Sequence, residues 1–337
     1  MASLECTTAQ KLTAMTDSTT PTFAQLVVAT AQPLAEGIHG FELRDPQGHE
    51  LPEFTAGAHI EVRAPNGVLR KYSLCNDPAG RDRYQIAVKR EVGGRGGSIS
   101  LIDGTRVGDR LEVLLPPRND FPLAPRATQH VFIAGGIGIT PIMAMIRHLK
   151  SSESGRFKLY YLNRTPAMTA FREELSGPEF RGQVVMHYDD GDPDSAFDLW
   201  PVLERPTGAH IYCCGPRPLL EAVRDMTGHW STAAVHFESF LDAAATRKPD
   251  DRPFRVRLAQ SGDVVAVGED QSILEALRAH GLDVPSSCES GTCGSCRTRL
   301  IAGEVDHRDL VLTEGEHATQ IMVCVSRARS DEIVIDR

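Results

Sequence analysis

The order of hydrophobic and polar positions divides the chain into three kinds of stretch. From about residue 22 to 124, apolar and polar residues alternate: Tyr84, Ile86 and Val88 share one side of "RYQIAVKR", and "RLEVLLP" repeats the pattern. Side chains two positions apart lie on the same face of a strand, so both segments are predicted strands with one buried face. Short strands separated by glycine turns such as "PNG" are typical of an antiparallel barrel, and we predict that fold here.

The pattern changes from about residue 127 to 238. Four continuous apolar runs, "HVFIAGG", "KLYYLN", "QVVMHY" and "HIYCCG", are separated by helix-like segments such as "TPIMAMIRHLK" and "RPLLEAVRDM". Strands that are apolar throughout are buried on both faces, as in a parallel sheet covered by helices. We therefore predict an α/β domain of the kind that binds nucleotides, although fold by itself does not establish function.

The last part of the chain begins with the polar segment "LDAAATRKPDDRP", which is predicted to be a linker. The strands "FRVRLA" and "DVVAV" follow, and then a helix that opens with the capping-box pair Ser272 and Glu275 and ends at Gly281. A cysteine-rich loop comes next. We predict the following division: a disordered lead at 1–21, a barrel domain at 22–124, an α/β domain at 125–238, a linker at 239–252 and a third domain at 253–337.

Length and charge limit the functions to consider. A chain of 337 residues needs about two or three domains, and its net charge of −9 argues against a nucleic-acid surface. The first twenty residues contain no Arg and no apolar core, so neither a signal peptide nor a presequence fits. The longest apolar stretch, "HVFIAGGIGITPIMAMI", is broken by three glycines and a proline and is not a membrane span. We expect a cytoplasmic protein without a membrane segment.

Four cysteines have the spacing of metal ligands. Cys288, Cys293 and Cys296 are separated by four and two residues, and Cys324 lies near the C-terminus. This matches the four thiolates of a plant-type [2Fe–2S] cluster, whereas a zinc site usually has two short cysteine pairs. In a reducing compartment, clustered cysteines bind metal more often than they form disulfides. We predict a [2Fe–2S] cluster here, and packed thiols at Cys75 and Cys213.

With this cysteine loop, the chain as a whole resembles the phthalate dioxygenase reductase family, which includes vanillate O-demethylase-like reductases. The resemblance covers about residues 22 to 337. It implies a multidomain fold with an antiparallel β-barrel flavin domain, an α/β parallel-sheet nucleotide domain and an α+β (β-grasp) plant-type ferredoxin domain. It also implies an NAD(P)H-dependent flavin and iron–sulfur oxidoreductase.

Two segments carry the expected flavin site. "RKYSLCNDP" is similar to the R-x-[YF]-S motif of ferredoxin-reductase-like domains, in which Arg70 would bind phosphate and the Ser73 hydroxyl would lie near the flavin N5. The later "GRGGS" offers consecutive backbone N–H groups for a phosphate, and each segment alone is also compatible with an exposed strand or a hairpin turn. The candidate FMN residues are Arg70, Lys71, Tyr72, Ser73, Ala87, Val88, Arg95, Gly96, Gly97 and Ser98. The resemblance favours FMN, and FAD stays open.

Two further segments carry the expected nicotinamide site. "GGIGITP" matches the superfamily's G-G-x-G-x-T-P, with glycines for close approach to a pyrophosphate, Thr140 as helix N-cap and Pro141 in the first turn. "CCGP" resembles the segment beside the nicotinamide, where Cys214 would join Ser73 near the hydride-transfer position; a buried thiol is the alternative. The candidate NAD residues are Gly135, Gly136, Gly138, Thr140, Pro141, Cys214, Gly215 and Pro216. Arg164 could bind an NADP phosphate, but we favour NADH. Phe237 or Phe240 could reach the flavin or pack in the core.

The three cofactors form a logical sequence. A hydride brings two electrons at once and a [2Fe–2S] cluster carries one, and a flavin can divide the pair. The expected path runs from NADH to FMN, to the cluster and then to a separate protein, with no side chain required as nucleophile or acid. The resemblance makes that partner a Rieske-type oxygenase acting on an aromatic or similar substrate, with this chain as a monomer. The alternatives are delivery to a cytochrome P450 and a non-enzymatic redox sensor.

Overall fold

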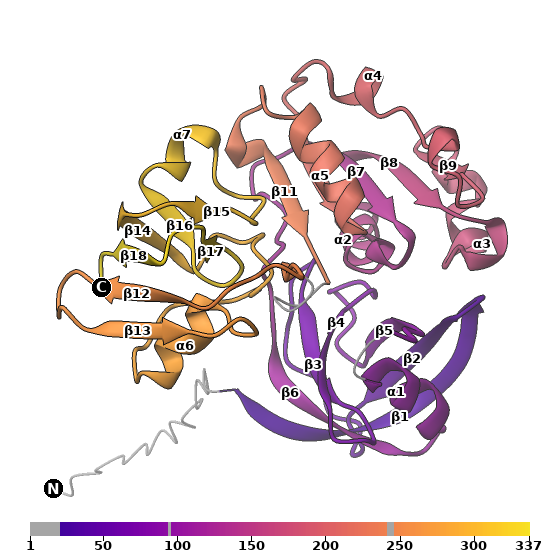
Figure 1. The fold of residues 1–337 in the computed structure, drawn as a ribbon. Helices are drawn as coiled ribbons and strands as arrows, with labels where there is room; N and C mark the ends of the chain where they lie inside the picture. The colour runs from indigo at the N-terminus through magenta and orange to yellow at the C-terminus, as the bar shows by residue number, and fades with distance from the viewer. Residues whose placement is uncertain (1–20, 94–95, 241–245) are drawn as a thin grey trace, which may run out of the picture.

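The computed structural model describes residues 21–93, 96–240 and 246–337, and its three large sheets give the molecule three lobes (Figure 1). The predicted fold class is confirmed, because these sheets are respectively antiparallel, parallel and mixed. The residue limits assigned to the domains stay a prediction. In the described part of the chain, no helix combines the length and apolar character needed to cross a membrane.

The first lobe is an antiparallel sheet with the strand order β4-β3-β6-β1-β2-β5. A bridge between Leu74 and Ile86 joins its two ends and closes the sheet toward a barrel. The alternation of "RYQIAVKR" has the predicted effect, since Tyr84, Ile86 and Val88 all point into the core. The elements are β1 (Thr22–Ala35), β2 (Ile38–Arg44), β3 (His59–Arg63), β4 (Leu69–Ser73), β5 (Tyr84–Lys89), α1 (Gly97–Gly104) and β6 (Arg110–Arg118).

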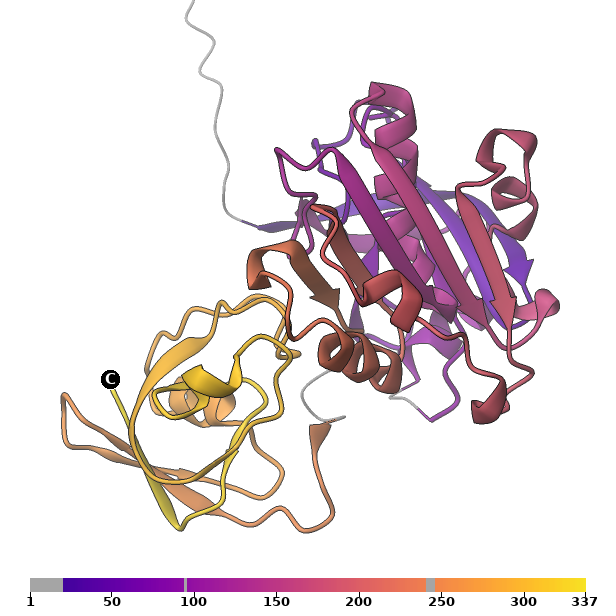
Figure 2. The same cartoon turned by 90° about the horizontal axis from the view of Figure 1, so that it is seen from above.

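The second lobe is a parallel sheet with the order β11-β10-β7-β8-β9, and Figure 2 shows its strands side by side with helices packed against them. Alternate residues of β7 and β10 pack on opposite sides, Phe132 and Tyr212 with α2, Ile133 and Ile211 with α5. Its elements are β7 (Gln129–Gly135), α2 (Ile139–Ser152), β8 (Arg156–Asn163), α3 (Arg172–Leu175), β9 (Val184–Tyr188), α4 (Trp200–Leu203), β10 (His210–Cys214), α5 (Arg217–Met226) and β11 (Val235–Glu238). Short 3-10 helices are η1 (Gly136–Gly138), η2 (Pro166–Met168), η3 (Pro178–Phe180), η4 (Pro193–Ser195) and η5 (Thr232–Ala234).

The third lobe is a mixed sheet with the order β13-β12-β18-β14-β16, against which α6 packs through Ile273, Leu274 and Leu277. The predicted capping box of Ser272 and Glu275 is present. The elements are β12 (Phe254–Leu258), β13 (Val264–Val267), α6 (Ile273–Ala279), β14 (Arg297–Ala302), β15 (Val305–Asp306), α7 (Glu314–His317), β16 (Gln320–Met322), β17 (Arg327–Ala328) and β18 (Glu332–Ile335).

The barrel and the α/β lobe share one core. Phe121 and Cys75 of the barrel side belong to the same buried cluster as the α2 side chains. Arg147 of α2 donates from Nη1 to the Cys75 carbonyl at 2.5 Å, and Tyr212 Oη accepts from the Ala124 N–H at 2.7 Å. These two lobes are therefore held together by packing as well as by buried hydrogen bonds.

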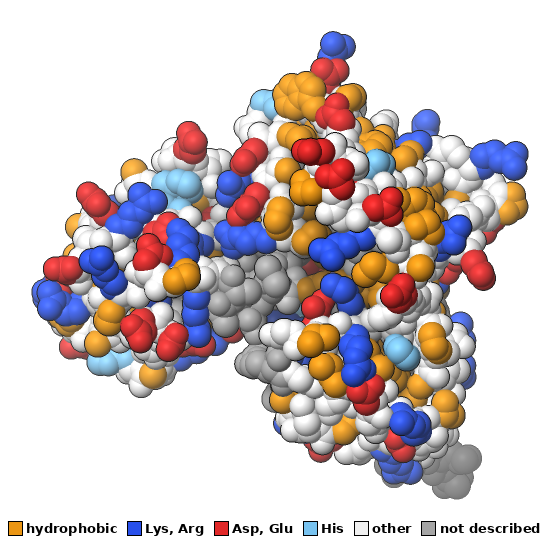
Figure 3. Space-filling view, turned by 45° about the vertical axis from the view of Figure 1, so that its right-hand side comes forward, with side chains coloured by type: hydrophobic (Ala, Val, Ile, Leu, Met, Phe, Trp, Pro, Cys, Tyr) orange, Lys and Arg blue, Asp and Glu red, His pale blue; other side chains and the backbone are white. Residues whose placement is uncertain are grey.

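The third lobe is attached through polar contacts to α5. Arg217 and Arg224 of that helix donate to the backbone carbonyls of Arg308 and Asp309, each at 3.3 Å. Arg308 in turn pairs with Asp251 of the preceding segment. On the face drawn in Figure 3, acidic and basic side chains are interspersed over all three lobes.

Candidate functional site

The three lobes meet where the cysteine loop, the ends of β10 and β11, and the start of β3 and end of β4 lie together (Figure 1). Lys71 of β4 donates to the Ser287 carbonyl at 3.0 Å, across the boundary between barrel and cysteine loop. The Cys214 thiol of β10 points toward Glu238 of β11. Residues of all three sequence motifs are thereby brought to one junction.

The three cysteines of the loop and Cys324 form two thiol pairs. Cys288 is hydrogen-bonded to Cys293, and Cys296 to Cys324. The hydrogen bond from Cys293 lowers the pKa of Cys288 to about 4, and the bond to Cys288 raises the pKa of Cys293. Among the described residues, no group of three metal-ligating side chains surrounds one point suited to a single ion.

Backbone N–H groups point at these sulfurs. The Ser290 N–H donates to Cys288 Sγ and the Cys288 N–H to Cys293 Sγ, both at 3.4 Å. The Gly291 N–H donates to Cys324. Gly291 has φ +76°, and a Cβ there would lie 2.7 Å from Val325 Cγ2, so only glycine fits this approach.

This donor set fits a two-iron cluster. Such a cluster takes four thiolates, two on each iron, and its sulfurs accept backbone hydrogen bonds that tune its reduction potential. Two thiol pairs with N–H groups directed at their sulfurs supply both requirements. A mononuclear zinc site needs four thiolates around one ion, which is a different grouping.

The proposed phosphate cradle of the flavin lies where β4 meets α1. A Cβ built on Gly97 would lie 3.0 Å from Arg70 Cγ, so the guanidinium stem crosses directly over the start of α1. Gly96, with φ +77°, precedes that helix, and the Ser98 hydroxyl accepts from the Glu91 N–H at 3.0 Å. A positively charged side chain beside the N–H groups of a helix N-terminus can bind a phosphate, so these residues fit the phosphate end of FMN.

The remaining flavin candidates are distributed around the cradle. Tyr72 is half-buried, its hydroxyl has no partner, and burial raises its pKa to about 12. Ala87 and Val88 are buried on β5, Val88 within the barrel core. Arg95 lies outside the described residues.

The two nicotinamide motifs pack backbone against backbone. A Cβ on Gly138 would lie 2.1 Å from the Cys214 carbonyl oxygen, and one on Gly135 would lie 2.6 Å from Pro216 Cδ. A Cβ on Gly215 would lie 3.0 Å from Gly135 Cα. β7 and β10 are adjacent strands on which the strand order reverses, the position where parallel sheets bind nucleotides.

The expectation that Thr140 caps a helix is wrong. The 3-10 turn Gly136–Gly138 runs directly into α2, so the helix begins at Ile139 with Gly138 as its N-cap. Thr140 is already inside the helix, and its hydroxyl donates to the Ile137 carbonyl at 3.1 Å. Pro141 does lie in the first turn.

The sequence interpretation missed Glu238. This carboxyl is partly buried, is hydrogen-bonded to Ser73 and lies 3.9 Å from the Cys214 sulfur. Burial raises its pKa to about 8, and the negative charges of Asp120 and Cys288 add to the effect. The available signal was a lone carboxylate at the end of the buried run "VHFE", paired in register with Cys214. Ser73 and Cys214, the two residues expected near the hydride-transfer position, therefore both contact Glu238.

Most of the other residues singled out from the sequence are exposed to solvent or packed in a hydrophobic core. Phe237 packs in the α5-side core, whereas Phe240 is 46% exposed, so packing is not its role. Arg164 is exposed after β8. Cys75 and Cys213 are buried thiols as predicted, and burial raises the pKa of Cys75 to about 11. His59 is buried at the junction, where burial lowers its pKa to about 4.

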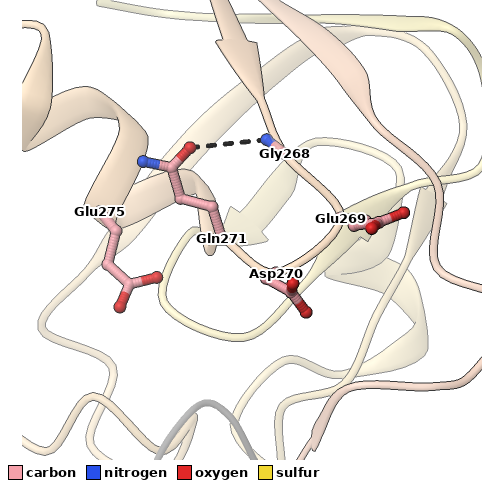
Figure 4. Close-up of a pocket in the computed structure, with 5 residues that line it drawn as sticks. All are labelled: Gly268, Glu269, Asp270, Gln271 and Glu275. Carbon is pink, nitrogen blue, oxygen red and sulfur yellow. Dashed lines mark hydrogen bonds between the residues drawn. The ribbon is translucent and has the colours of Figure 1, made fainter.

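A hollow of about 570 Å³ lies elsewhere, on the third lobe (Figure 4). It is lined by Gly268, Glu269, Asp270, Gln271 and Glu275. Gln271 Oε1 accepts from the Gly268 N–H at 3.5 Å, and Glu275 belongs to the capping box of α6. These residues build a turn and a helix start, and none belongs to the three motifs.

Two family models match separate parts of the chain. Residues 132–225 match the oxidoreductase NAD-binding domain, and residues 256–329 match the 2Fe-2S iron-sulfur cluster binding domain. The chain is 56% identical to the phthalate 4,5-dioxygenase oxygenase reductase subunit of Pseudomonas putida over 93% of this chain and 97% of that one. It is 55% identical to the phthalate dioxygenase reductase of Burkholderia cepacia, with the same shares covered. The solved structure of a phthalate dioxygenase reductase matches with a TM-score of 0.68 and 54% identity over 94% of this chain and 98% of that chain.

Proposed function

The chain belongs to the phthalate dioxygenase reductase family, and from this membership we propose how its own residues carry electrons from NADH through FMN and a [2Fe–2S] cluster to an oxygenase. The observation that carries the proposal is the junction at which Ser73, Cys214 and the Cys288 loop come together. When bound, FMN takes a hydride as a pair of electrons and passes them singly to the cluster.

The barrel would hold FMN. Arg70, Gly96, Gly97 and Ser98 would bind its phosphate, because they place a guanidinium and helical N–H groups together, and the further candidate Arg95 lies outside the described residues. Lys71, Tyr72, Ser73, Ala87 and Val88 are the residues that would contact its ring. The half-buried Tyr72 hydroxyl, without a partner, is available to a ligand.

The α/β lobe would hold NADH. Gly135, Gly136 and Gly138 approach its pyrophosphate at the start of α2, where Thr140 and Pro141 form the first turn. Cys214, Gly215 and Pro216 would contact its nicotinamide end. Glu238, hydrogen-bonded to Ser73 and facing the Cys214 thiol, holds or releases a proton at this position without reacting with substrate.

Cys288, Cys293, Cys296 and Cys324 would hold the cluster and send electrons to a separate protein. We propose a Rieske-type oxygenase acting on an aromatic substrate, phthalate being the first to test because two relatives are named for it. The reductase would work as a monomer in the cytoplasm. Delivery to a cytochrome P450 would use the same relay and is distinguished by the acceptor that is reduced.

The test is an anaerobic titration of the purified holoenzyme with NADH and, separately, NADPH. The proposal expects bound FMN and iron, and bleaching of both flavin and cluster absorption in proportion to added NADH. A colourless protein without iron, or a spectrum that NADH does not bleach, would contradict it. Electron delivery is then measured with a Rieske-type phthalate oxygenase and with a P450 as alternative acceptors.

A further inference from the structure

Two adjacent serines before Cys288 are held by different domains. Ser286 Oγ donates to Glu289 Oε1 at 2.9 Å and accepts a hydrogen bond from Arg278 of α6, so it is fixed within its own lobe. Ser287 Oγ donates to Asp120, which follows β6 of the barrel. The "SSC" sequence therefore joins one serine to the cluster lobe and the next to the flavin lobe.

Ser287 has a second contact with the barrel. Its carbonyl accepts from Lys71 Nζ at 3.0 Å, so both its side chain and its backbone are bound to flavin-domain residues. Lys71 directly precedes Tyr72 and Ser73 of the flavin motif, and Ser287 directly precedes Cys288. The hydrogen bond from Lys71 to Ser287 thus connects a residue of the flavin motif to the residue directly before the cluster ligand Cys288.

We propose that Asp120 and Lys71 are positioning residues for electron transfer, because by holding Ser287 they fix the distance between the flavin motif and the Cys288 loop. The inference rests on the proposed function and deepens it. The step concerned moves one electron, with no bond made or broken. The rate of electron transfer falls as the distance between donor and acceptor grows, so a cysteine loop that moves away from the barrel slows this step.

The third lobe also has an attachment that does not involve Ser287. Arg217 and Arg224 hold the third lobe on α5 through the carbonyls of Arg308 and Asp309, on a separate surface. Loss of the Ser287 contacts would leave that attachment in place. The lobes would stay associated, and the cysteine loop would shift relative to the barrel.

The experiment separates the two electron steps in the anaerobic holoenzyme by rapid mixing with NADH. In Ser287→Ala and Asp120→Ala, cluster reduction is expected to slow by about tenfold, with flavin reduction changed by less than about twofold. Because both variants remove the same bond, the double variant should be no slower than either single one. Ser286→Ala is the matched control, since it removes the neighbouring hydroxyl without touching the barrel contact.

A second measurement does not depend on activity. Hydrogen exchange of residues 284–292 should rise in Ser287→Ala, Asp120→Ala and Lys71→Met. Lys158→Met, which removes a lysine that donates to the Gly182 carbonyl at 2.8 Å in the α/β lobe, is the control and should not change this segment. Cluster midpoint potentials should match the wild type.

Two results would overturn the inference. One is cluster reduction at the wild-type rate in Ser287→Ala and Asp120→Ala; the other is a changed cluster potential that accounts for the slower rate. Failure of the wild-type holoenzyme itself to reduce first its flavin and then its cluster would contradict the proposed function instead.

Discussion

The Cys214 sulfur lies 3.9 Å from the Glu238 carboxyl group, at the ends of neighbouring parallel strands where Cys214 is buried and Glu238 is partly buried. Burial and the neighbouring Glu238 charge raise the pKa of the Cys214 thiol. The thiol is therefore protonated at neutral pH and donates to the carboxylate, which makes Glu238 the group of this pair that titrates in the ordinary pH range.

The raised pKa of Glu238 predicts a stability profile. The carboxyl changes from an ordinary value of 4.5 to about 8 on folding. Between these values the folded chain binds the extra proton, so stability contributed by Glu238 is complete below about pH 4.5 and falls as pH rises toward 8. Glu238→Gln removes the charge and should be more stable than the wild type at pH 8.5, with the difference disappearing at pH 5.

Thermal midpoints of both proteins at pH 5, 6.5 and 8.5 measure this difference. A constant offset across the three pH values would show that Glu238 does not titrate in this range. The same variant should also lose any dependence of flavin reduction on this ionisation, which rapid mixing with NADH records.

The buried pair of Arg308 and Asp251 predicts the opposite profile. The hydrogen bond from Arg308 lowers the pKa of Asp251 from 3.8 to about 2. Its stabilisation is therefore present above about pH 3.8 and is lost as pH falls toward 2. Asp251→Asn should cost about 1–2 kcal/mol at pH 7 and progressively less in acid.

Denaturant unfolding at pH 7 and pH 3 tests this prediction. Arg308→Ala should cost more, about 3 kcal/mol, because the buried guanidinium pairs with both Asp251 and Asp306. The exposed pair of Arg205 and Glu204 provides the control, and Arg205→Ala should change stability by less than about 0.5 kcal/mol. Equal losses in the two arginine variants would refute the assignment.

The contact between the glycine turn and the "CCGP" turn predicts a steric effect. A Cβ on Gly138 would lie 2.1 Å from the Cys214 carbonyl, so Gly138→Ala should cost about 3 kcal/mol and weaken NADH binding while FMN is retained. Gly315→Ala in α7 is the control, because nothing lies within 4 Å of its Cβ. Unfolding curves and NADH titrations measure both, and normal NADH affinity in Gly138→Ala would contradict the packing argument.

The phosphate cradle predicts that FMN binding depends on Arg70. Arg70→Ala should weaken FMN binding by about tenfold or more, since charge-assisted bonds to phosphate contribute about 1.5–3 kcal/mol. The exposed Arg126→Ala should retain FMN. Fluorescence titration of the apoprotein with FMN and FAD measures this, and FAD bound more tightly than FMN would correct the cofactor assignment.

The sequence predicted features that depend on neighbouring residues. Strand alternation at Tyr84, Ile86 and Val88 and the capping box at Ser272 are local patterns, and the structure contains both. The N-cap prediction at Thr140 failed because a preceding 3-10 turn runs directly into the helix and moves the N-cap back to Gly138, which residue identity does not encode. The spacing of Cys288, Cys293 and Cys296 is also a local pattern, whereas the pairing of Cys296 with the distant Cys324 was not predicted.

Features built from distant segments were not predictable. Asp120 lies in the proline-rich connection after β6, 167 residues before its partner Ser287, and nothing in either segment indicates the contact. Glu238 becomes buried only because β10, β11 and the barrel meet at its carboxyl group. Such sites depend on how domains are placed, and a pattern within one strand cannot specify that placement.

The pairing of Cys288 with Cys293 predicts that electron delivery through the cluster can be abolished while reduction of the flavin by NADH is retained. Cys293→Ser removes one of two thiolates from one pair, so the holoenzyme should lose its cluster iron and its electron delivery to the oxygenase. FMN binding depends on Arg70 and α1 in a separate lobe, so NADH should still bleach the flavin at a rate within about twofold of the wild type. Cys75→Ser is the control, because this buried thiol lies outside the two pairs and only donates to the Gln85 carbonyl at 3.2 Å. Iron analysis, single-turnover flavin reduction and acceptor reduction are measured on the same preparation. A folded, FMN-loaded Cys293→Ser protein that has lost both activities would show that hydride transfer also depends on the cluster, and the separation of the two steps would then be wrong.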